Sequence, residues 1–402
     1  MKLKRYTWHK VIFTVLRYTV GYFVKLSYGF KFKRYKGPDK PALIFANHNT
    51  NLDPALIGLA FSRHVYFLGS EHAFRVGFAS KLMNFIFAPI PFNKARTDVN
   101  SIKEILRRLK AGATVCLFAE GDRSFNGQTG PIALSTAKLA KTSGAELITY
   151  RLECAYFVAP RWADNKRKGD ICGVVVNKYT VDELKSMSAN EVLAAIERDL
   201  FEDAYERQLS SPRQYKGKNL AESIETVLYL CPVCKSFATI KSEGNRFFCG
   251  CGLDGIYTEE GFLEVVLGSD SEGDPRRDLN NYQLQFSTIT DWDHWQTEQL
   301  PGMIEATGHE TICFDENQQL FEVNPAVDKT LIGEGAMRIN RTTFHCAGLD
   351  FPLDNVTRFT IVGQQTLMFA LIDGPTYEVR SQTPRSALKY REIYRVLMGE
   401  TK

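Results

Sequence analysis

The feature that most constrains the fold is an alternation of short apolar runs with longer helical patterns between Asp39 and Leu209. Short apolar runs bounded by turn residues are typical of buried strands, and apolar residues three or four positions apart are typical of helices. The predicted strands are Ala42–Ala46, Val65–Leu68, Ala88–Phe92, Thr114–Phe118, Leu147–Leu152 and Ile171–Val176, and the predicted helices are Glu71–Phe85, Ser101–Lys110, Pro131–Thr142 and Val181–Gln208. This alternation predicts an α/β domain with a mostly parallel sheet flanked by helices.

Polar residues that can act together in catalysis follow the first predicted strand. Asn47 and His48 come directly after it, and Asp53 stands five positions after the histidine. Because five positions along a helix put two side chains on different faces, His48 and Asp53 meet only if the intervening loop curls back. An alternative role for Asp53 is a helix N-cap, since Pro54 follows it and suits the first helical position.

Two further strand ends carry charged residues. The strand Thr114–Phe118 is followed by Glu120, Gly121, Arg123 and Ser124, and the strand ending at Phe92 is followed by Lys94 and Arg96. Arginine can bind phosphate through two parallel hydrogen bonds, whereas lysine binds it as a point charge. Since sites in α/β sheets lie at the carboxyl ends of strands, the three segments predict one site for an anionic hydroxyl substrate. A solvated charged turn is the alternative for Lys94 and Arg96 alone.

These segments resemble sequence blocks of the glycerolipid acyltransferases, the family that includes the 1-acylglycerol-3-phosphate acyltransferases. The resemblance covers roughly residues 30 to 180. Asn47, His48 and Asp53 fit the first block, and Phe118, Glu120, Gly121, Arg123 and Ser124 fit the third. The chain departs from the third block at Ala119 and Asp122, where the family usually has proline and threonine. It also departs from the second block, where Asn93 and Lys94 replace aspartate and arginine, and from the fourth, which reads Ile148-Thr149-Tyr150.

The resemblance implies transfer of a fatty acyl group from a thioester donor, acyl-CoA or acyl-carrier protein, to the hydroxyl of a lysophospholipid. Histidine has a reference pKa of about 6.5, so His48 suits a general base near neutral pH, and Asp53 would orient it. No Ser or Cys nucleophile lies in the block, which predicts direct transfer. The implied substrate-binding residues are Asn47, Lys94, Arg96, Glu120, Gly121, Arg123 and Ser124.

Two other functions fit the same residues. One is an acyltransferase with the same base but glycerol 3-phosphate or an aminolipid as acceptor. The other is a non-catalytic, membrane-associated protein that binds lipid or a partner. The departures at Asn93, Ala119 and Asp122 are the support for this second alternative.

The first 38 residues differ sharply in charge from the rest. Met1 to Pro38 holds ten Lys or Arg and no acid, whereas the remainder has 40 basic against 46 acidic residues. The apolar run Val11–Val24 has fourteen residues and contains Arg17, whereas a bilayer-spanning helix needs about 20 apolar residues. It also lacks a cleavage site typical of signal peptides. The segment therefore predicts a helix lying on a surface of anionic lipids, at the cytoplasmic face of the membrane. A basic amphipathic helix docked on the core is the alternative.

Four of the nine cysteines are clustered: Cys231, Cys234, Cys249 and Cys251. Without a signal peptide, nine cysteines argue for a reducing compartment and against disulfides. Four thiols in this spacing predict a closed, structural Zn²⁺ site, although the second pair is tighter than the usual CxxC arrangement. A redox pair or unligated thiols are the alternatives. Because the module holds few basic residues, we expect no nucleic-acid partner.

The length of 402 residues predicts more than one domain. The expected division is a membrane-interface segment at 1–38, an acyltransferase domain at 39–212, a zinc-ribbon-like module at 228–256 and a β-rich domain at 257–402. Alternating patterns after Tyr282 predict several strands, and Ser386–Met398 predicts a final helix. That order suits a small pleckstrin-homology-like barrel.

Overall fold

The computed structural model describes residues 3–37, 40–70, 86–92, 99–265, 286–323 and 329–400. The chain forms two compact units, residues 1–161 with 166–216 and residues 162–165 with 217–402. The expected zinc-ribbon-like and β-rich ranges both fall in the second unit, and the four-part division stays a prediction. The predicted helix Glu71–Phe85 lies outside the described residues.

The first unit contains a seven-stranded sheet in the order β1-β7-β6-β2-β5-β3-β4. All neighbouring strands are parallel except β6 and β7, so the predicted mostly parallel α/β sheet is confirmed. The strand β1 was not predicted. The strands are β1 Phe30–Phe32, β2 Ala42–Ala46, β3 Val65–Ser70, β4 Ile90–Phe92, β5 Thr114–Phe118, β6 Glu146–Glu153 and β7 Ile171–Tyr179.

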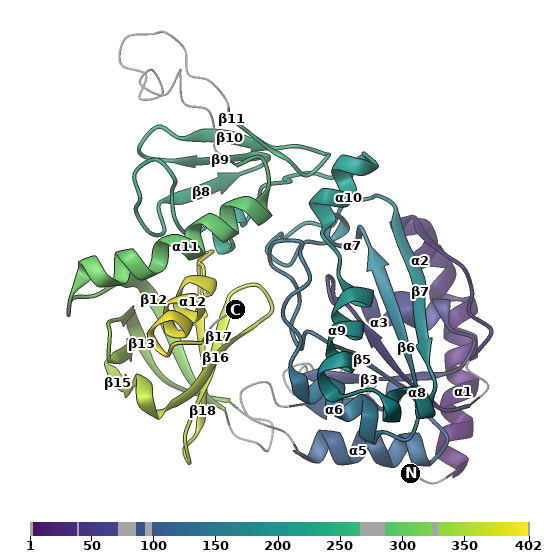
Figure 1. The fold of residues 1–402 in the computed structure, drawn as a ribbon. Helices are drawn as coiled ribbons and strands as arrows, with labels where there is room; N and C mark the ends of the chain where they lie inside the picture. Colours follow the sequence, from purple (N-terminus) through teal and green to yellow (C-terminus); the bar gives the residue numbers. More distant parts are fainter. Residues whose placement is uncertain are drawn as a thin grey trace. The chain divides into compact units, whose positions relative to one another are not determined.

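Helices cover both faces of this sheet (Figure 1). Leu43, Phe45, Val115 and Leu147 from the central strands share one buried apolar core with residues of α5, α6 and α9. All five residues of β2 are buried, as expected of a central parallel strand that helices cover on both faces. The helices are α1 Leu3–Tyr18, α2 Val20–Tyr28, α3 Asp53–Ala60, α5 Val99–Lys110, α6 Leu134–Thr142, α7 Ala155–Val158, α8 Val181–Ser186, α9 Ala189–Leu200 and α10 Ala204–Ser210.

The single helix predicted over Val181–Gln208 is wrong, because this stretch forms α8, α9 and α10. Ser188 begins α9 with a capping box, in which its side chain accepts the backbone N–H of Glu191. Asp203 begins α10 by accepting two backbone N–H groups. Both side chains satisfy N–H groups that have no partner inside a helix, so they start new helices.

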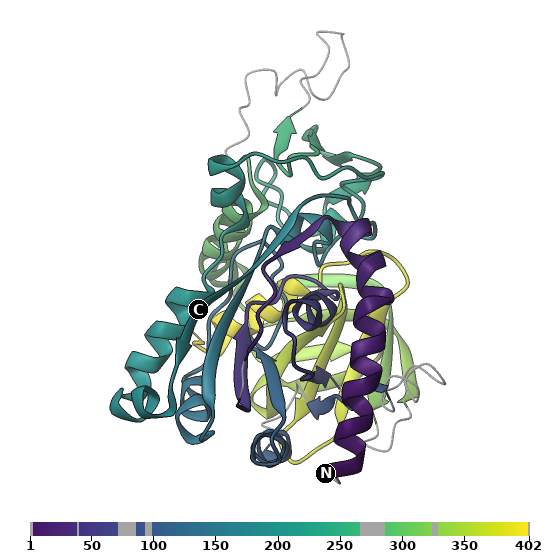
Figure 2. The same cartoon turned by 90° about the vertical axis from the view of Figure 1, so that its right-hand side faces the viewer.

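The helices α1 and α2 run nearly end to end along one side of the first unit (Figure 2), joined by a hydrogen bond from the Thr19 N–H to the Val15 carbonyl. Their inner face packs on the sheet. His9 Nδ1 lies 2.8 Å from the Tyr66 hydroxyl, and the Phe13 ring lies 5.2 Å from that of His64. Exposed apolar residues on the two helices are Trp8, Val11, Val15, Tyr18, Tyr22, Phe23 and Leu26. None of the helices in the described ranges has the length and apolar content needed to cross a bilayer.

The second unit begins with a four-stranded antiparallel sheet of β8 Ile240–Glu243, β9 Arg246–Cys249, β10 Asp254–Tyr257 and β11 Leu263–Val265. The next element is the helix α11, Ile289–Thr307, which was not predicted. Its Trp292 side chain donates to the Leu230 carbonyl at 2.9 Å, and Gln296 accepts from the backbone N–H of Tyr229. The helix is therefore part of the packing around the cysteine module. Short 3-10 helices are Ile224–Thr226 and Leu353–Asn355.

The predicted β-rich region forms a seven-stranded antiparallel sheet in the order β15-β14-β13-β12-β18-β17-β16. The first strand of this sheet in chain order, residues 313–323, has an irregularity in its pairing between Asp315 and Gln318. The likeness to a pleckstrin-homology barrel stays a prediction. The elements are β12 Cys313–Val323, β13 Lys329–Ile339, β14 Thr343–Cys346, β15 Leu349–Pro352, β16 Val356–Val362, β17 Thr366–Leu371, β18 Thr376–Ser381 and α12 Leu388–Leu397.

Candidate active site

His48 and Asp53 form a close pair at the carboxyl end of β2. The Nδ1 atom of His48 lies 2.8 Å from Oδ2 of Asp53. The aspartate side chain is fully buried and that of the histidine is 18% exposed. The loop between them curls back, as the pairing requires. The predicted N-cap role of Asp53 is wrong, because α3 begins at Asp53 with Leu52 as its N-cap.

The carboxylate of Asp53 is held by the loop that precedes it. Oδ2 accepts the backbone N–H groups of Asn49 at 2.7 Å and Thr50 at 2.9 Å, and Oδ1 accepts the Thr50 hydroxyl at 2.7 Å. These donors stabilise an ionised carboxylate, which can only accept hydrogen bonds. The Nδ1 atom of His48 therefore carries a proton, and Nε2 is the basic ring nitrogen.

The turn after β5 is bonded to both sides of the His48 backbone. The His48 N–H donates to Oε1 of Glu120 at 2.7 Å, and the Ser124 N–H donates to the His48 carbonyl at 2.9 Å. The Ala119 N–H also donates to the Ala46 carbonyl at 3.0 Å, continuing the pairing of the two strands. The structure thus brings together the two segments that carry the family resemblance.

Glu120 also holds a third segment, because its Oε2 accepts the Gly130 N–H at 2.8 Å. Burial, with the nearby charges of Asp53 and Asp122, raises the pKa of the Glu120 carboxyl to about 8, against the effect of the two N–H donors. Gly121 has φ +71, a left-handed conformation that glycine adopts without strain. The acid and the glycine therefore shape the turn, and their contact with substrate stays a prediction.

An aromatic ring supports the His48 imidazole from one side. The Phe118 ring at the end of β5 stacks on it, with the ring centroids 3.9 Å apart and the planes 13° from parallel. Phe67 stacks in turn on Phe118 at 6.4 Å. Close stacking and the bond to Asp53 fix both the tilt and the rotation of the imidazole.

Arg123 lies in a turn that Asp122 and Arg161 stabilise. Oδ1 of Asp122 accepts the Arg123 backbone N–H at 3.0 Å, and Oδ2 lies 2.7 Å from Nη1 of Arg161. Burial lowers the pKa of the Arg123 guanidinium. Arg161 was missed by the sequence analysis because it belongs to no motif. The acid at Asp122, where the family has threonine, was the one signal of a compensating cation.

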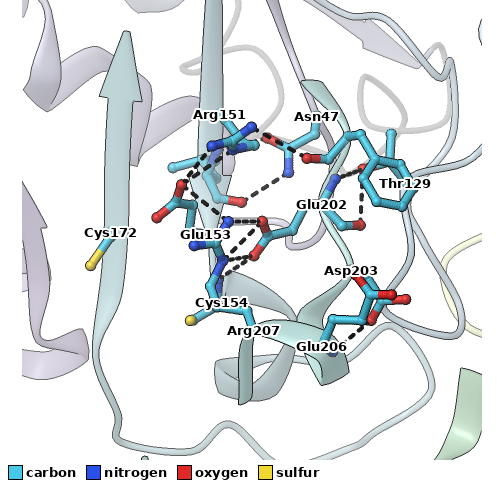
Figure 3. A network of polar contacts seen from close by, with 12 residues as sticks. Asn47, Thr129, Arg151, Glu153, Cys154, Cys172, Glu202, Asp203, Glu206 and Arg207 are labelled. Atoms are coloured by element: carbon cyan, nitrogen blue, oxygen red, sulfur yellow. Dashed lines mark hydrogen bonds and ion pairs between the residues drawn. The ribbon is translucent and has the colours of Figure 1, made fainter. Parts of the chain in front are cut away.

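Asn47 connects β2 to β6. Its amide donates to the Leu152 carbonyl at 2.8 Å, and its side-chain oxygen accepts the Leu152 N–H at 2.7 Å. Figure 3 shows this residue beside a network in which Arg207 bridges Glu153 and Glu202. The Asn47 side chain therefore joins two strands, and its contact with substrate stays a prediction.

Three predicted binding residues remain, Ser124, Lys94 and Arg96, and the structure describes only Ser124. The Ser124 hydroxyl donates to the Gln128 carbonyl at 2.8 Å and accepts the Gly127 N–H at 2.9 Å, so it organises the following loop. Lys94 and Arg96 lie outside the described residues.

The four clustered cysteines of the second unit come together in space. Their Sγ atoms all lie within 4.8 Å of one another, with Cys231 and Cys251 at 3.7 Å and Cys234 and Cys249 at 3.8 Å. A tetrahedral ion with bonds of about 2.3 Å to sulfur requires sulfurs about 3.8 Å apart. The cluster can hold a metal ion.

Residues 29–153 match the family model described as Acyltransferase. The chain is 24% identical over 161 residues to a chloroplastic 1-acyl-sn-glycerol-3-phosphate acyltransferase of Arabidopsis thaliana, covering 39% of this chain and 44% of that protein. It is 26% identical over 117 residues to a second such chloroplastic enzyme, of Brassica napus, covering 28% and 33%. The chain thus spans less than half the length of these relatives. A crystal structure of the 1-acyl-sn-glycerophosphate acyltransferase of Thermotoga maritima aligns with a TM-score of 0.38 and 15% identity, covering 52% of this chain and 98% of that one.

The matched segment includes β2, the His48–Asp53 pair and the turn after β5, so the site lies in an acyltransferase-family domain. The two relatives that this segment resembles are both 1-acyl-sn-glycerol-3-phosphate acyltransferases.

Proposed function

We propose that this protein transfers a fatty acyl group from a thioester donor to the free hydroxyl of 1-acylglycerol-3-phosphate or a similar lysolipid. The observation that carries the proposal is the His48–Asp53 pair, whose histidine backbone is bonded to the turn holding Arg123. This arrangement links the base to a turn that carries a half-buried arginine. An acceptor that carries a hydroxyl and a phosphate requires a base for the hydroxyl and a cation for the phosphate.

The reaction needs one proton acceptor and no covalent enzyme intermediate. Nε2 of His48 takes the proton from the acceptor hydroxyl, and the oxygen attacks the thioester carbonyl carbon. The tetrahedral intermediate then collapses, the carbon–sulfur bond breaks, and the leaving thiolate takes the proton from the imidazolium. Asp53 stabilises the imidazolium while it exists and keeps the ring in the required tautomer. The products are the diacyl phospholipid and the thiol released from the donor. The donor is acyl-CoA or acyl-carrier protein.

Cations around the site recognise the acceptor. Arg123 binds the phosphate, together with Lys94 and Arg96 from the segment after β4. Arginine is suited to this role because its planar guanidinium forms two parallel hydrogen bonds to phosphate oxygens. Asn47, Glu120, Gly121 and Ser124 hold the loops that carry His48 and Arg123, and they complete the proposed substrate-binding set.

The protein works on a membrane surface rich in anionic lipid, at its cytoplasmic face. Val11, Val15, Tyr18, Tyr22 and Leu26 are each at least half exposed and recur at helical spacing along α1 and α2. An apolar face of this kind, in a segment with ten basic residues and no acid, suits a helix lying in the lipid interface. The lysolipid acceptor would be reached from that surface.

The cysteine cluster holds a structural Zn²⁺ ion. The two sulfur pairs at 3.7 and 3.8 Å match the spacing of a tetrahedral Cys₄ site. With four thiolates filling the coordination sphere, the ion would stabilise the module and take no part in catalysis.

The test is an assay with purified protein, acyl-CoA and lysophosphatidate in vesicles containing anionic phospholipid, with phosphatidate followed by mass spectrometry. H48A removes the base, and H309A, at an exposed histidine of the second unit, is the matched control. We expect product from the wild type and H309A and a loss of at least about a thousandfold in kcat for H48A.

Equal product from wild type and H48A would contradict the mechanism. An acceptor panel with glycerol 3-phosphate and an aminolipid decides the substrate class. If no acceptor is acylated by either acyl donor while the protein still binds the vesicles, the protein is a lipid- or partner-binding member of the family.

A further inference from the structure

The turn that carries Arg123 contains an acid directly before it. Asp122 uses one carboxylate oxygen to accept the Arg123 backbone N–H at 3.0 Å. Its side chain is 26% exposed. A carboxylate at this position opposes the binding of an anion by the neighbouring guanidinium, because like charges repel strongly in a partly buried site.

Arg161 is placed to remove this repulsion. Its side chain is 1% exposed, and Nη1 lies 2.7 Å from Oδ2 of Asp122. The same nitrogen donates to the Arg123 carbonyl at 2.8 Å. The guanidinium also lies over the Phe125 ring, 4.0 Å from its centroid, so it is held on a third side.

These contacts have a consequence for Arg123. Arg161 contacts the backbone of Arg123 through the carbonyl, and Asp122 contacts it through the N–H. The pair therefore fixes the peptide groups on both sides of the Arg123 Cα atom. A buried arginine that is paired with an acid can do this without adding net charge to the turn.

We propose that Arg161 is a positioning and specificity-determining residue for the anionic acceptor. It acts on Arg123 through Asp122: by neutralising that acid, it lets the turn bind a phosphate and not repel it. The proposal rests on the proposed function, since it assigns the phosphate of the acceptor to this turn. It also explains how this chain carries an acid where the family usually has threonine.

The experiment is a double-mutant cycle on the full chain, with KM for lysophosphatidate, kcat and melting temperature measured for the wild type, R161M, D122N and D122N/R161M. R161M removes the cation that lies 2.7 Å from Asp122, so we expect it to raise KM by at least about tenfold, with a smaller change in kcat. D122N removes the charge but keeps an oxygen that accepts the Arg123 N–H, so we expect its KM to rise less than about threefold. The double variant should return to within about threefold of the wild-type KM.

A purely structural role predicts a different pattern. The matched control is R108M, because Arg108 is also buried and pairs with Glu104 at 2.7 Å on α5. It should lower the melting temperature and leave KM unchanged. The proposal is overturned if the double variant is as impaired in KM as R161M, or if R161M leaves KM unchanged.

Two further outcomes are also decisive. If R161M does not fold, R161K and the double variant replace it. A KM rise of less than about tenfold for R161K, together with a near wild-type KM for the double variant, supports the proposal. A tenfold KM rise for D122N alone overturns it. If the wild type forms no phosphatidate, the proposed function fails. The cycle is then measured as equilibrium binding of lysophosphatidate without donor, where the same pattern supports the pair and equal affinities overturn it.

Discussion

Glu120 fixes the main chain of His48: Oε1 of the acid accepts the histidine N–H at 2.7 Å, across 72 positions of sequence. The second oxygen accepts the Gly130 N–H at 2.8 Å. One carboxyl group thus joins the loop after β2, the turn after β5 and the segment before α6. The position of the base depends on an acid that need not touch the substrate.

The first prediction concerns the pH dependence of stability. Burial raises the pKa of Glu120 to about 8 in the folded protein, so the folded state keeps a proton that the unfolded state releases. The contribution of this group to the free energy of unfolding is therefore full at low pH and is lost as pH rises from about 4.5 to about 8. In E120Q this decline disappears. Urea unfolding at several pH values measures it, with E197Q at an exposed position of α9 as control. Identical pH dependence in E120Q and wild type would contradict the assignment.

The second prediction concerns the orientation of the base. In D53N an amide replaces the carboxylate that accepts Nδ1–H of His48, so the imidazole loses its preferred tautomer and its charge partner. We expect kcat to fall by about 10²- to 10⁴-fold with little change in KM. D53N keeps an oxygen for the N–H groups of Asn49 and Thr50, so its melting temperature should fall less than that of D53A. A kcat within tenfold of wild type would argue against Asp53 as the orienting acid.

The third prediction separates structure from substrate binding at Asn47. N47A leaves the buried N–H and C=O of Leu152 without the two hydrogen bonds from this side chain. Each lost partner costs about 1 to 3 kcal/mol of unfolding free energy. N190A, at an exposed position of α9, should change stability by no more than about 0.5 kcal/mol. Denaturant unfolding of both variants is the measurement, and equal stability would show that the two bonds contribute nothing.

The fourth prediction concerns the membrane surface. Tyr22 and Phe23 are 60% and 68% exposed on α2, so Y22S/F23S removes apolar area available to lipid without opening the core. We expect weaker sedimentation with vesicles containing anionic phospholipid, by about tenfold in partition coefficient. L209S is the matched control, because Leu209 is also 68% exposed but lies on α10. An equal decrease in the vesicle partition coefficient for both variants would argue against α2 as the membrane-binding surface.

The fifth prediction concerns the metal. Purified protein should contain about one Zn²⁺ per chain by elemental analysis, and C231S should abolish it. Because the proposed ion would join Cys231 and Cys234 to Cys249 and Cys251, its removal by a chelator should lower the melting temperature of the second unit. The proposed reaction at His48 in the first unit needs no metal. Any loss of activity after chelation should therefore appear only once the protein has begun to unfold. Full-length protein that is stable, folded and free of zinc would exclude the structural metal.

Much of the fold could be predicted from the sequence, because local pattern and burial agree there. The strands Ala42–Ala46 and Thr114–Phe118 have the predicted bounds, since short apolar runs between turn residues have few alternatives. Elements whose limits depend on side-chain caps or on packing were missed. The breaks at Ser188 and Asp203 come from capping bonds, and α11 forms where Trp292 and Gln296 pack against the cysteine module.

For the site, the sequence by itself determined which residue types were available: a histidine and an aspartate after one strand, and an acid, a glycine and an arginine after another. The tertiary structure alone decided which of them lie in contact. His48 and Asp53 meet because backbone N–H groups of Asn49 and Thr50 turn the carboxylate back toward the loop. Arg161, 39 residues after Asp122 and in no motif, reaches it because the chain returns past the end of β6. Hydrogen bonds and ion pairs form between groups that are close in space, and that proximity is a property of the packed chain.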